Sequence, residues 1–196
     1  MESPDNALMA QVRDGDVGRL AVLFERHHRP LFHYFIRLNG NRDLSEDLVQ
    51  DVFFRMLRYR HTYKDGYPFT AWMYQIARNA RIDHAQKRKA EVVSLEDRVN
   101  NSEEPASAAP GAEEGLRFRQ NVSLLKRALA RLPVEKREVL ILSRYQNLKY
   151  EEIAGVLGCE VGTVKVRVYR AVRALSEIFN ELAGERTAGD ALGDGR

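Results

Sequence analysis

The sequence predicts an all-α fold of two small helical domains joined by a flexible acidic linker, in which the C-terminal domain is a four-helix unit with a helix-turn-helix. Apolar residues recur at spacings of three and four through most of the chain, whereas the alternating pattern of strands is almost absent. A middle stretch rich in Ser, Pro and acidic residues cannot build a core. We therefore expect one domain at 1–90, the linker at 91–117, a second domain at 118–183 and a disordered tail at 184–196.

The composition indicates an ordinary globular protein of one or two domains. The chain has 196 residues, of which 44% are hydrophobic, and its formal net charge of +3 is too small to identify a nucleic-acid partner by itself. The single cysteine, Cys159, excludes an intramolecular disulfide and favours a reducing cytosol. The first residues lack a signal-peptide pattern, and no apolar run approaches the roughly 18 residues of a membrane span. We expect a cytoplasmic protein that is a monomer when free and does not insert into membranes.

Three long helices are expected in the first domain. The first covers 18–38, where Pro30 should kink or break it. The second opens at Asp43, and Glu46 three residues later completes a capping-box pattern. An aromatic-rich loop follows, and Pro68 then suits the first turn of the third helix, which reaches the end of the domain.

The second domain ends in a pattern typical of a helix-turn-helix. The expected helices cover 150–157 and 161–182, and Gly158 lies between them where the turn needs positive φ. Ala154 is small at the point where the two helices must cross closely. The inner faces are expected to consist of Ile153, Ala154 and Leu157 on the first helix, and of Val161, Val164, Val168, Val172 and Leu175 on the second.

This burial pattern leaves a basic face on the second helix of the motif. An α-helix fits the major groove of DNA, where Arg and Lys reach guanine acceptors and Thr reaches bases or phosphates. The later arginines are expected to neutralise phosphates. The plainer alternative is the solvated basic face of an ordinary helical bundle. The candidate DNA-binding residues are Thr163, Lys165, Arg167, Arg170 and Arg173.

The third helix of the first domain ends in a basic segment preceded by aromatic residues. Residues 78–89 contain five Lys or Arg and one acid, Asp83. Cations that follow phosphates, beside rings that stack on bases, suit single-stranded DNA. Two aromatic residues are expected in the core, and two others either stack on bases or pack inside: Phe69 and Trp72, and Tyr63 and Tyr67, respectively.

The second helix has a polar face that includes an aromatic residue. Its apolar stripe points one way, and at 100° per residue Asp47, Gln50, Asp51 and Phe54 fall on the far side. An exposed Phe among polar neighbours indicates a protein-contact surface. The alternative is that Phe54 packs beneath a loop.

Taken together, these residues resemble the extracytoplasmic-function group of the sigma-70 family of bacterial RNA polymerase sigma factors. Residues 43–57 look like the family's polymerase-clamp-binding helix, 69–79 like its promoter-melting helix, and 132–170 like its reader of the upstream promoter element. The three stretches occur in the family's order and cover both expected domains.

The resemblance implies that different segments of the chain bind different partners. The face with Asp47, Gln50, Asp51 and Phe54 would dock on the largest subunit of core RNA polymerase. The linker would run toward the RNA exit path. The loop at 61–68 and the helix after it would capture the minus-ten element of promoter DNA, in a manner resembling base flipping. The residues expected at this element are Tyr63, Tyr67, Arg78, Asn79, Arg81, His84 and Arg88.

The helix from Val161 would read the minus-thirty-five element as duplex. Three positions depart from the family's usual pattern: Lys149 where a Ser or Thr cap is common, Glu160 where Ser or Pro often opens the reading helix, and Val166 in place of a frequent Ser. Val166 either touches a thymine methyl or packs, and we include it among the expected minus-thirty-five residues. An anti-sigma factor is a further partner compatible with the resemblance.

Two rival functions are compatible with parts of the sequence. A helix-turn-helix transcription regulator that is not a sigma factor would explain the C-terminal motif, but not the basic aromatic helix or the face around Phe54. An enzyme with a metal site at His27, His28 and His33 is disfavoured, because these side chains lack a ligand pattern such as His-Glu-x-x-His. We expect no catalytic residue, metal or cofactor.

Overall fold

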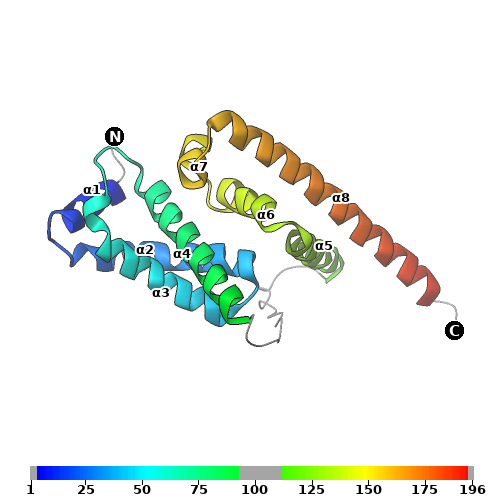
Figure 1. Cartoon of the computed structure of the whole chain (residues 1–196). Coiled ribbons are helices and arrows are strands. Elements are labelled where there is room, and N and C mark those ends of the chain that lie inside the picture. Colours follow the sequence, from blue (N-terminus) through cyan, green and yellow to red (C-terminus); the bar gives the residue numbers. More distant parts are fainter. Residues whose placement is uncertain (1–3, 93–111, 194–196) are drawn as a thin grey trace.

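The computed structural model describes residues 4–92 and 112–193, with side chains described for 4–88 and 118–185, and within these ranges it contains helices and no strand. The all-α prediction is therefore confirmed for the described residues. The N-terminal group consists of α1 (Pro4–Arg13), α2 (Arg19–Asn39), α3 (Arg42–Arg58), the short 3₁₀ turn η1 (Arg60–Thr62) and α4 (Phe69–Val92) (Figure 1). The C-terminal group consists of α5 (Ala112–Arg131), α6 (Val134–Leu140), the π-helical turn η2 (Ile141–Tyr145), α7 (Tyr150–Leu157) and α8 (Val161–Gly193).

The start of the chain forms a helix that the sequence analysis did not predict. Pro4 occupies the first position of α1, and Met9 and Val12 are fully buried. Pro30 was predicted to kink or break the next helix, α2, and the helix continues through it without a break. It ends at Gly40, whose φ of 68° is the left-handed conformation that glycine adopts readily.

The cap of α3 differs from the prediction. The side chain of Asn41, not Asp43, accepts the backbone N–H of Leu44 at 2.9 Å. Glu46 does not complete a capping box but pairs with Arg42 at 2.9 Å. Asn41 is favoured as the N-cap because its extended backbone places the side-chain amide oxygen over the first turn of the helix.

Two boundaries in the C-terminal group also differ from expectation. Helix α5 begins at Ala112 rather than near residue 118, and α8 continues through Gly193 although a disordered tail was expected from Gly184. The residues 184–193 include three glycines, but also Ala188, Ala191, Leu192, Glu185 and Arg186, which favour a helix. Of the expected linker, residues 93–111 lie outside the described residues.

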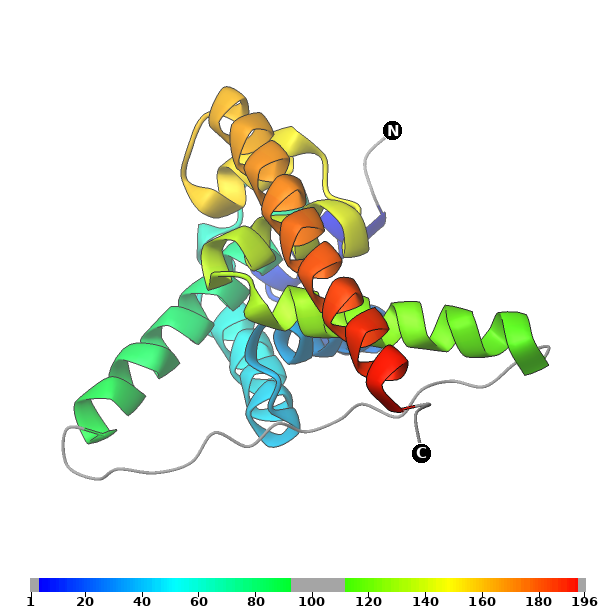
Figure 2. The ribbon, with the colours of Figure 1, turned by 90° about the vertical axis from the view of Figure 1, so that its right-hand side faces the viewer.

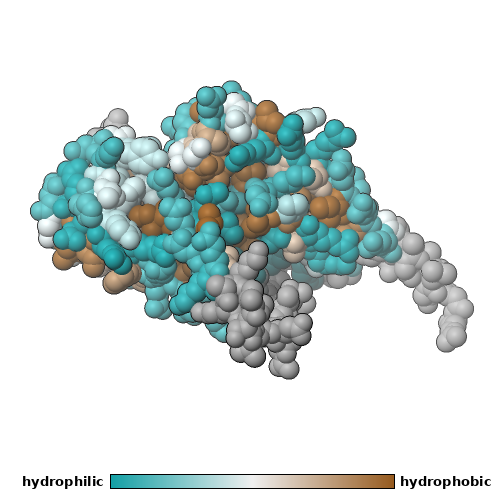
Figure 3. All heavy atoms as spheres, viewed as in Figure 1, coloured by the Kyte–Doolittle hydropathy of each residue, from teal (hydrophilic) through white to brown (hydrophobic). Residues whose placement is uncertain are grey.

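The two groups of helices pack against each other. Helices α2 and α4 contact α5, α6, α7 and η2, and most buried apolar side chains of both groups join in one continuous cluster, while Leu124, Ala128 and Leu182 form a second, smaller cluster. Figure 2 shows α8 running along the outside of the C-terminal group and crossing α5. On the face seen in Figure 3, hydrophilic side chains dominate, and apolar atoms form separate patches between them. The sequence pattern predicts two modules on a tether and gives no sign of this shared core.

Candidate nucleic-acid interface

The helix-turn-helix has the predicted geometry. Gly158 adopts φ 62° and ψ 42°, as expected for the turn, and Ile153 and Ala154 are buried on the inner face of α7. The first turn of α7 is held by the carboxylate of Glu152, which accepts the backbone N–H of Lys149 at 2.8 Å. This contact is the glutamate half of a capping box, and the other half, in which a Ser or Thr side chain at the cap accepts a backbone N–H of the first turn, is absent at Lys149.

Helix α8 presents the predicted basic face to solvent. Its inner side is formed by Val164, Val168 and Ala171, all buried. Val172 was expected inside but is exposed, because Ala171 follows Val168 at a spacing of three and occupies the inner position. The side chains predicted to contact the minus-thirty-five element are all exposed: Thr163, Lys165, Val166, Arg167, Arg170 and Arg173.

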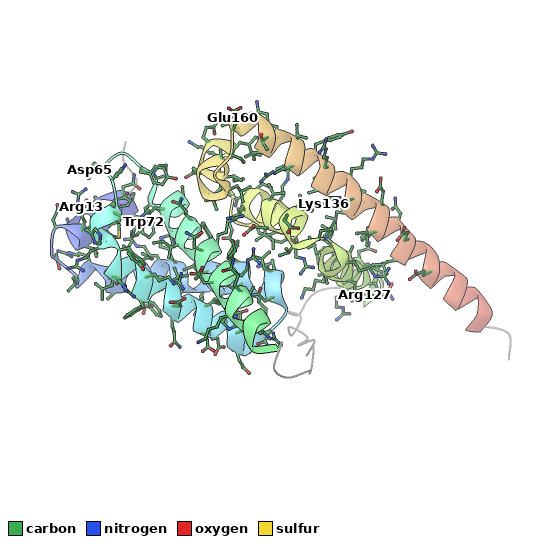
Figure 4. All side chains as sticks on the ribbon, viewed as in Figure 1. Arg13, Asp65, Trp72, Arg127, Lys136 and Glu160 are labelled. Atoms are coloured by element: carbon green, nitrogen blue, oxygen red, sulfur yellow. The ribbon has the colours of Figure 1, made fainter. Side chains whose placement is uncertain are left out.

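Acidic side chains also lie beside this basic face of α8. Glu160 is exposed immediately before α8, where a carboxylate suits the positive helix end, and Figure 4 shows it at that end of the helix. Arg173 pairs with Glu177 one turn later at 3.1 Å. Both arginine and glutamate are highly exposed, so this pair is weak and Arg173 is available to a phosphate.

Helix α4 presents only part of its predicted minus-ten surface to solvent. Asn79, His84 and Arg88 are exposed. Arg78 and Arg81 are partly buried and face Glu138 of α6, whose carboxylate lies 3.4 Å from Nε of Arg78 and 3.6 Å from a terminal nitrogen of Arg81. The two arginines are therefore occupied by the C-terminal group in this arrangement.

The two loop tyrosines are also engaged within the protein. Tyr63 is 2% exposed, packs edge-on against Trp72, and donates its hydroxyl to the carbonyl of Tyr67 at 2.8 Å. The expectation that Tyr63 stacks on a base is therefore corrected: its ring belongs to the core, like those of Phe69 and Trp72, which were predicted there. Tyr67 is half-buried with its hydroxyl against Gly155 of α7, and burial, together with the nearby Glu152, raises its pKa.

A cavity of about 380 Å³ lies beside the exposed part of α4. Leu44 and Leu48 form apolar walls, while Arg81, His84 and Arg88 contribute cationic or hydrogen-bonding groups. Two buried donors beside it, Nε of Arg81 and Nδ2 of Asn39, have no hydrogen-bond partner among the described residues. Because buried donors require acceptors, this site suits oxygen-rich groups such as phosphates or base edges.

The predicted polymerase-contact face is largely exposed on α3. Asp47 and Gln50 are exposed, and Phe54 is 63% exposed, which excludes packing of this ring beneath a loop. Asp51 is different, because it is half-buried and pairs with Arg55 at 2.9 Å. Arg55 also binds Asp83 of α4 at 2.5 Å, so Asp51 contributes to the contact between α3 and α4.

Helix α1 anchors the loop that precedes α4. Oδ1 of Asn6 accepts the backbone N–H of Phe69 at 2.9 Å, which satisfies a free donor in the first turn of α4. Arg13 binds Asp65 in the loop at 2.7 Å, and Figure 4 shows the two side chains meeting. Burial raises the pKa of Asp5, but its hydrogen bonds to Arg26 and His27 outweigh burial and keep the pKa below its ordinary value. These contacts connect α1 to α2, the loop and α4.

The substitution Asn6→Ala is expected to loosen the start of α4 and the loop before it. Loss of a capping contact costs about 1 kcal/mol, which corresponds to roughly fivefold faster local opening. Hydrogen exchange of the backbone amides of Tyr67 and Phe69 measures this effect. The matched variant Asn6→Asp retains the acceptor and should exchange at nearly the original rate. Equal acceleration in both variants would show that the capping contact is not responsible.

The histidines considered as metal ligands have local roles. His27 Nε2 lies 2.8 Å from a carboxylate oxygen of Asp5, and His28 Nδ1 lies 2.9 Å from the carbonyl oxygen of Phe24. Among the described residues, no group of three or more His, Cys, Asp or Glu side chains is arranged to hold a metal ion.

Among the helices of residues 4–92 and 112–193, none is both long enough and apolar enough to cross a membrane.

Glu138 is the main interface residue that the sequence analysis missed. It lies four residues after Val134 and three before Ile141, in line with an apolar stripe. An acidic residue on such a stripe indicates a buried charge with a specific partner, which was the available signal. Its partners were not identifiable, because they lie in a distant part of the chain.

In a comparison with known proteins, each of the two helical groups matches a region of the Sigma-70 family. Residues 23–91 match the family described as Sigma-70 region 2, and residues 123–175 match Sigma-70, region 4. The chain is 35% identical over 146 residues to the ECF RNA polymerase sigma factor EcfG of Rhodopseudomonas palustris, covering 74% of this chain and 77% of the relative. It is 32% identical over 174 residues to the RNA polymerase sigma factor CarQ of Myxococcus xanthus, covering 89% and 97%.

Solved structures show the same likeness. The sigma factor RpoE of Bartonella quintana, in complex with the anti-sigma factor NepR, is 28% identical, with a TM-score of 0.65 over 82% of this chain and 96% of the other. The fold also matches that of CnrH in complex with the cytosolic domain of CnrY, with a TM-score of 0.67 over 91% and 99% of the two chains at 22% identity.

Proposed function

Since this chain belongs to the extracytoplasmic-function group of the sigma-70 family, we propose that its two basic helices divide promoter recognition between them. A sigma factor directs core RNA polymerase to promoters, so the chain's partners are core polymerase and promoter DNA. A helix-turn-helix regulator of another class is not favoured, because region 2 and region 4 both match in the order found in sigma factors.

We assign the minus-thirty-five element to α8. The observation that carries this assignment is the exposed row of Thr163, Lys165 and Arg167, followed by Arg170 and Arg173, directly after the tight turn at Gly158. This spacing brings the start of the helix to base edges and the later arginines to the DNA backbone. Val166 is exposed beside them and fits a thymine methyl.

We assign the minus-ten element to α4 and the cavity beside it. Asn79 and His84 are exposed polar groups for base contacts, and Arg88 is an exposed cation for a phosphate. The unpartnered donors of Arg81 and Asn39 support an acceptor-rich ligand at this place. Arg78 and Arg81 join this surface only after they separate from Glu138.

We assign contact with polymerase to the α3 face of Asp47, Gln50 and Phe54. An exposed aromatic ring flanked by polar groups is the composition expected of an interface residue. The protein would then work in the cytoplasm, where polymerase acts, as a monomer until it binds polymerase, and without catalytic chemistry of its own. An anti-sigma factor is a proposed further partner, because the sigma factor RpoE, which is 28% identical to this chain, is found in complex with one.

Site-specific crosslinking tests the two DNA assignments. A photoreactive phenylalanine analogue replaces either His84 or Thr163 in the full chain, which is then assembled with core polymerase on a promoter. The analogue at position 84 should crosslink to the minus-ten element, and the analogue at position 163 to the minus-thirty-five duplex. Crosslinks at the opposite elements, or none to DNA from a transcribing complex, would refute the assignment.

A further inference from the structure

Helix α1 supports the loop that leads into α4. It lies outside the stretch 23–91 that matches Sigma-70 region 2. It nevertheless contacts both η1 and α4, the two elements that flank the loop at 63–68. Its side chains Met9 and Val12 are buried in the main apolar cluster of the protein. The helix is therefore a firmly packed part of the N-terminal group, from which side chains can hold the loop.

The last residue of α1, Arg13, is held on one side and reaches the loop on the other. The carboxylate of Asp14 accepts Nε at 2.8 Å and Nη2 at 3.3 Å, and such a two-point contact fixes the plane of the guanidinium group. The third nitrogen, Nη1, donates to Oδ1 of Asp65 at 2.7 Å and reaches the carbonyl oxygen of Tyr63 more weakly, at 3.5 Å. Figure 4 shows Arg13 and Asp65 pointing toward each other.

The loop forms a tight turn on a buried base. Tyr63 packs in the core against Trp72 and donates its hydroxyl to the carbonyl of Tyr67 at 2.8 Å. The backbone N–H of Tyr67 donates to the carbonyl of Lys64 at 3.2 Å, which closes the turn. Gly66 permits this shape, because its φ of 75° costs glycine little. The loop is thus ordered before any strand of DNA arrives.

The tip of this turn combines an exposed cation with an exposed acid. Lys64 and Asp65 are both exposed just before α4, the helix to which we assign the minus-ten element. Lys64 attracts a phosphate of an unpaired strand, whereas the carboxylate of Asp65 repels it. By pairing with Asp65, Arg13 offsets this repulsion and draws the carboxylate toward α1. The same contact restricts the loop, so less conformational entropy is lost when a flexible strand binds.

We propose that Arg13, oriented by Asp14, is a positioning residue for promoter opening. Its contacts with Asp65 and with the carbonyl of Tyr63 hold the loop in the conformation in which Lys64 meets a phosphate of the unpaired minus-ten strand. Arg13 acts through the loop and does not itself touch the DNA. This inference rests on the proposed function, because it takes the minus-ten element to lie at α4.

Replacing Arg13 by Ala tests the proposal in the polymerase complex. The full chain is assembled with core polymerase and titrated with two labelled probes: a single strand carrying the minus-ten element of a promoter that the complex transcribes, and a duplex carrying its minus-thirty-five element. We expect the affinity for the single strand to fall about threefold, as for the loss of one exposed ion pair, and the affinity for the duplex to stay unchanged. The matched control, Arg19→Ala, removes the same charge from an ion pair with Asp16 at 3.0 Å and should change neither affinity.

A second variant, Arg13→Lys, separates positioning from charge. Lysine keeps the charge but replaces the planar fork by a single ammonium group, so it cannot hold Asp14 at two points and reach the loop in the same geometry. We expect this variant to lose about as much single-strand affinity as Arg13→Ala. In the free chain, both variants should also accelerate hydrogen exchange of the Tyr67 amide, whose hydrogen bond closes the turn, whereas Arg19→Ala should not.

The outcomes separate this proposal from the one on which it rests. Single-strand affinity retained in both Arg13 variants would overturn the positioning role, and affinity retained in Arg13→Lys alone would do so too, because charge would then suffice. An equal loss of duplex affinity would also overturn it, since it would indicate a general weakening of the complex. In each of these cases, crosslinking from position 84 to the minus-ten element would still support the assignment of α4.

Discussion

Replacing Phe54 by Ala is expected to weaken binding to core RNA polymerase by about 30-fold, a loss of about 2 kcal/mol, typical of an aromatic residue at the centre of an interface. The ring is 63% exposed in the free protein, so its removal leaves no internal cavity and should not lower the melting temperature measurably. Titration of labelled protein with core polymerase measures the affinity, and calorimetry measures the melting temperature.

The matched control for this substitution is Phe118→Ala. Phe118 is 68% exposed on α5, outside the proposed polymerase face, so removal of the same ring there should leave the affinity unchanged. A similar loss in both variants would indicate that general surface hydrophobicity drives the binding. An unchanged affinity in Phe54→Ala would show that the polymerase contacts another face.

Replacing Lys165 and Arg167 together by Ala is expected to reduce promoter binding by the assembled enzyme by at least about 2 kcal/mol, roughly 30-fold. Contacts to base edges contribute sequence preference and contacts to phosphates contribute salt dependence. Because Lys165 and Arg167 are assigned to base edges, the double variant should lose sequence preference while its dependence on salt changes little. Electrophoretic or fluorescence titration at several salt concentrations gives both quantities. Both side chains are exposed, so folding should be unaffected.

Two comparisons decide whether this effect belongs to the minus-thirty-five element. Arg127→Ala removes one exposed cation from α5, away from the reading face (Figure 4), and should leave binding nearly unchanged. On a promoter whose upstream element is scrambled, the original chain and the double variant should bind alike. A persistent difference on the scrambled promoter would mean that Lys165 and Arg167 do not read this element.

The elements predicted correctly depend on local sequence. The turn at Gly158, the buried side of α8 at Val164 and Val168, and the burial of Trp72 follow from helical spacing and backbone preference within one segment. The exposure of Phe54 follows from the same spacing on α3. Periodicity within a helix determines which side faces the core, so these features can be predicted from the sequence alone.

The features that were missed depend on contacts between distant segments. The hydroxyl of Tyr34 and the carboxylate of Glu138 are separated by 104 positions, and the amide of Asn6 reaches Phe69 across 63. Nothing in the local pattern identifies such partners. Tyr63 illustrates the consequence, because its loop position suggested access to DNA, whereas its contact with Trp72 places the ring in the core.

Promoter-dependent transcription is the most direct test of the whole account. Purified core polymerase is mixed with the chain and a pool of genomic promoter fragments, and the RNA ends are sequenced. We predict discrete start sites that require the chain, that share an upstream and a downstream element, and that decline in the Phe54→Ala variant. RNA synthesis no more specific than that of core polymerase alone would contradict the account.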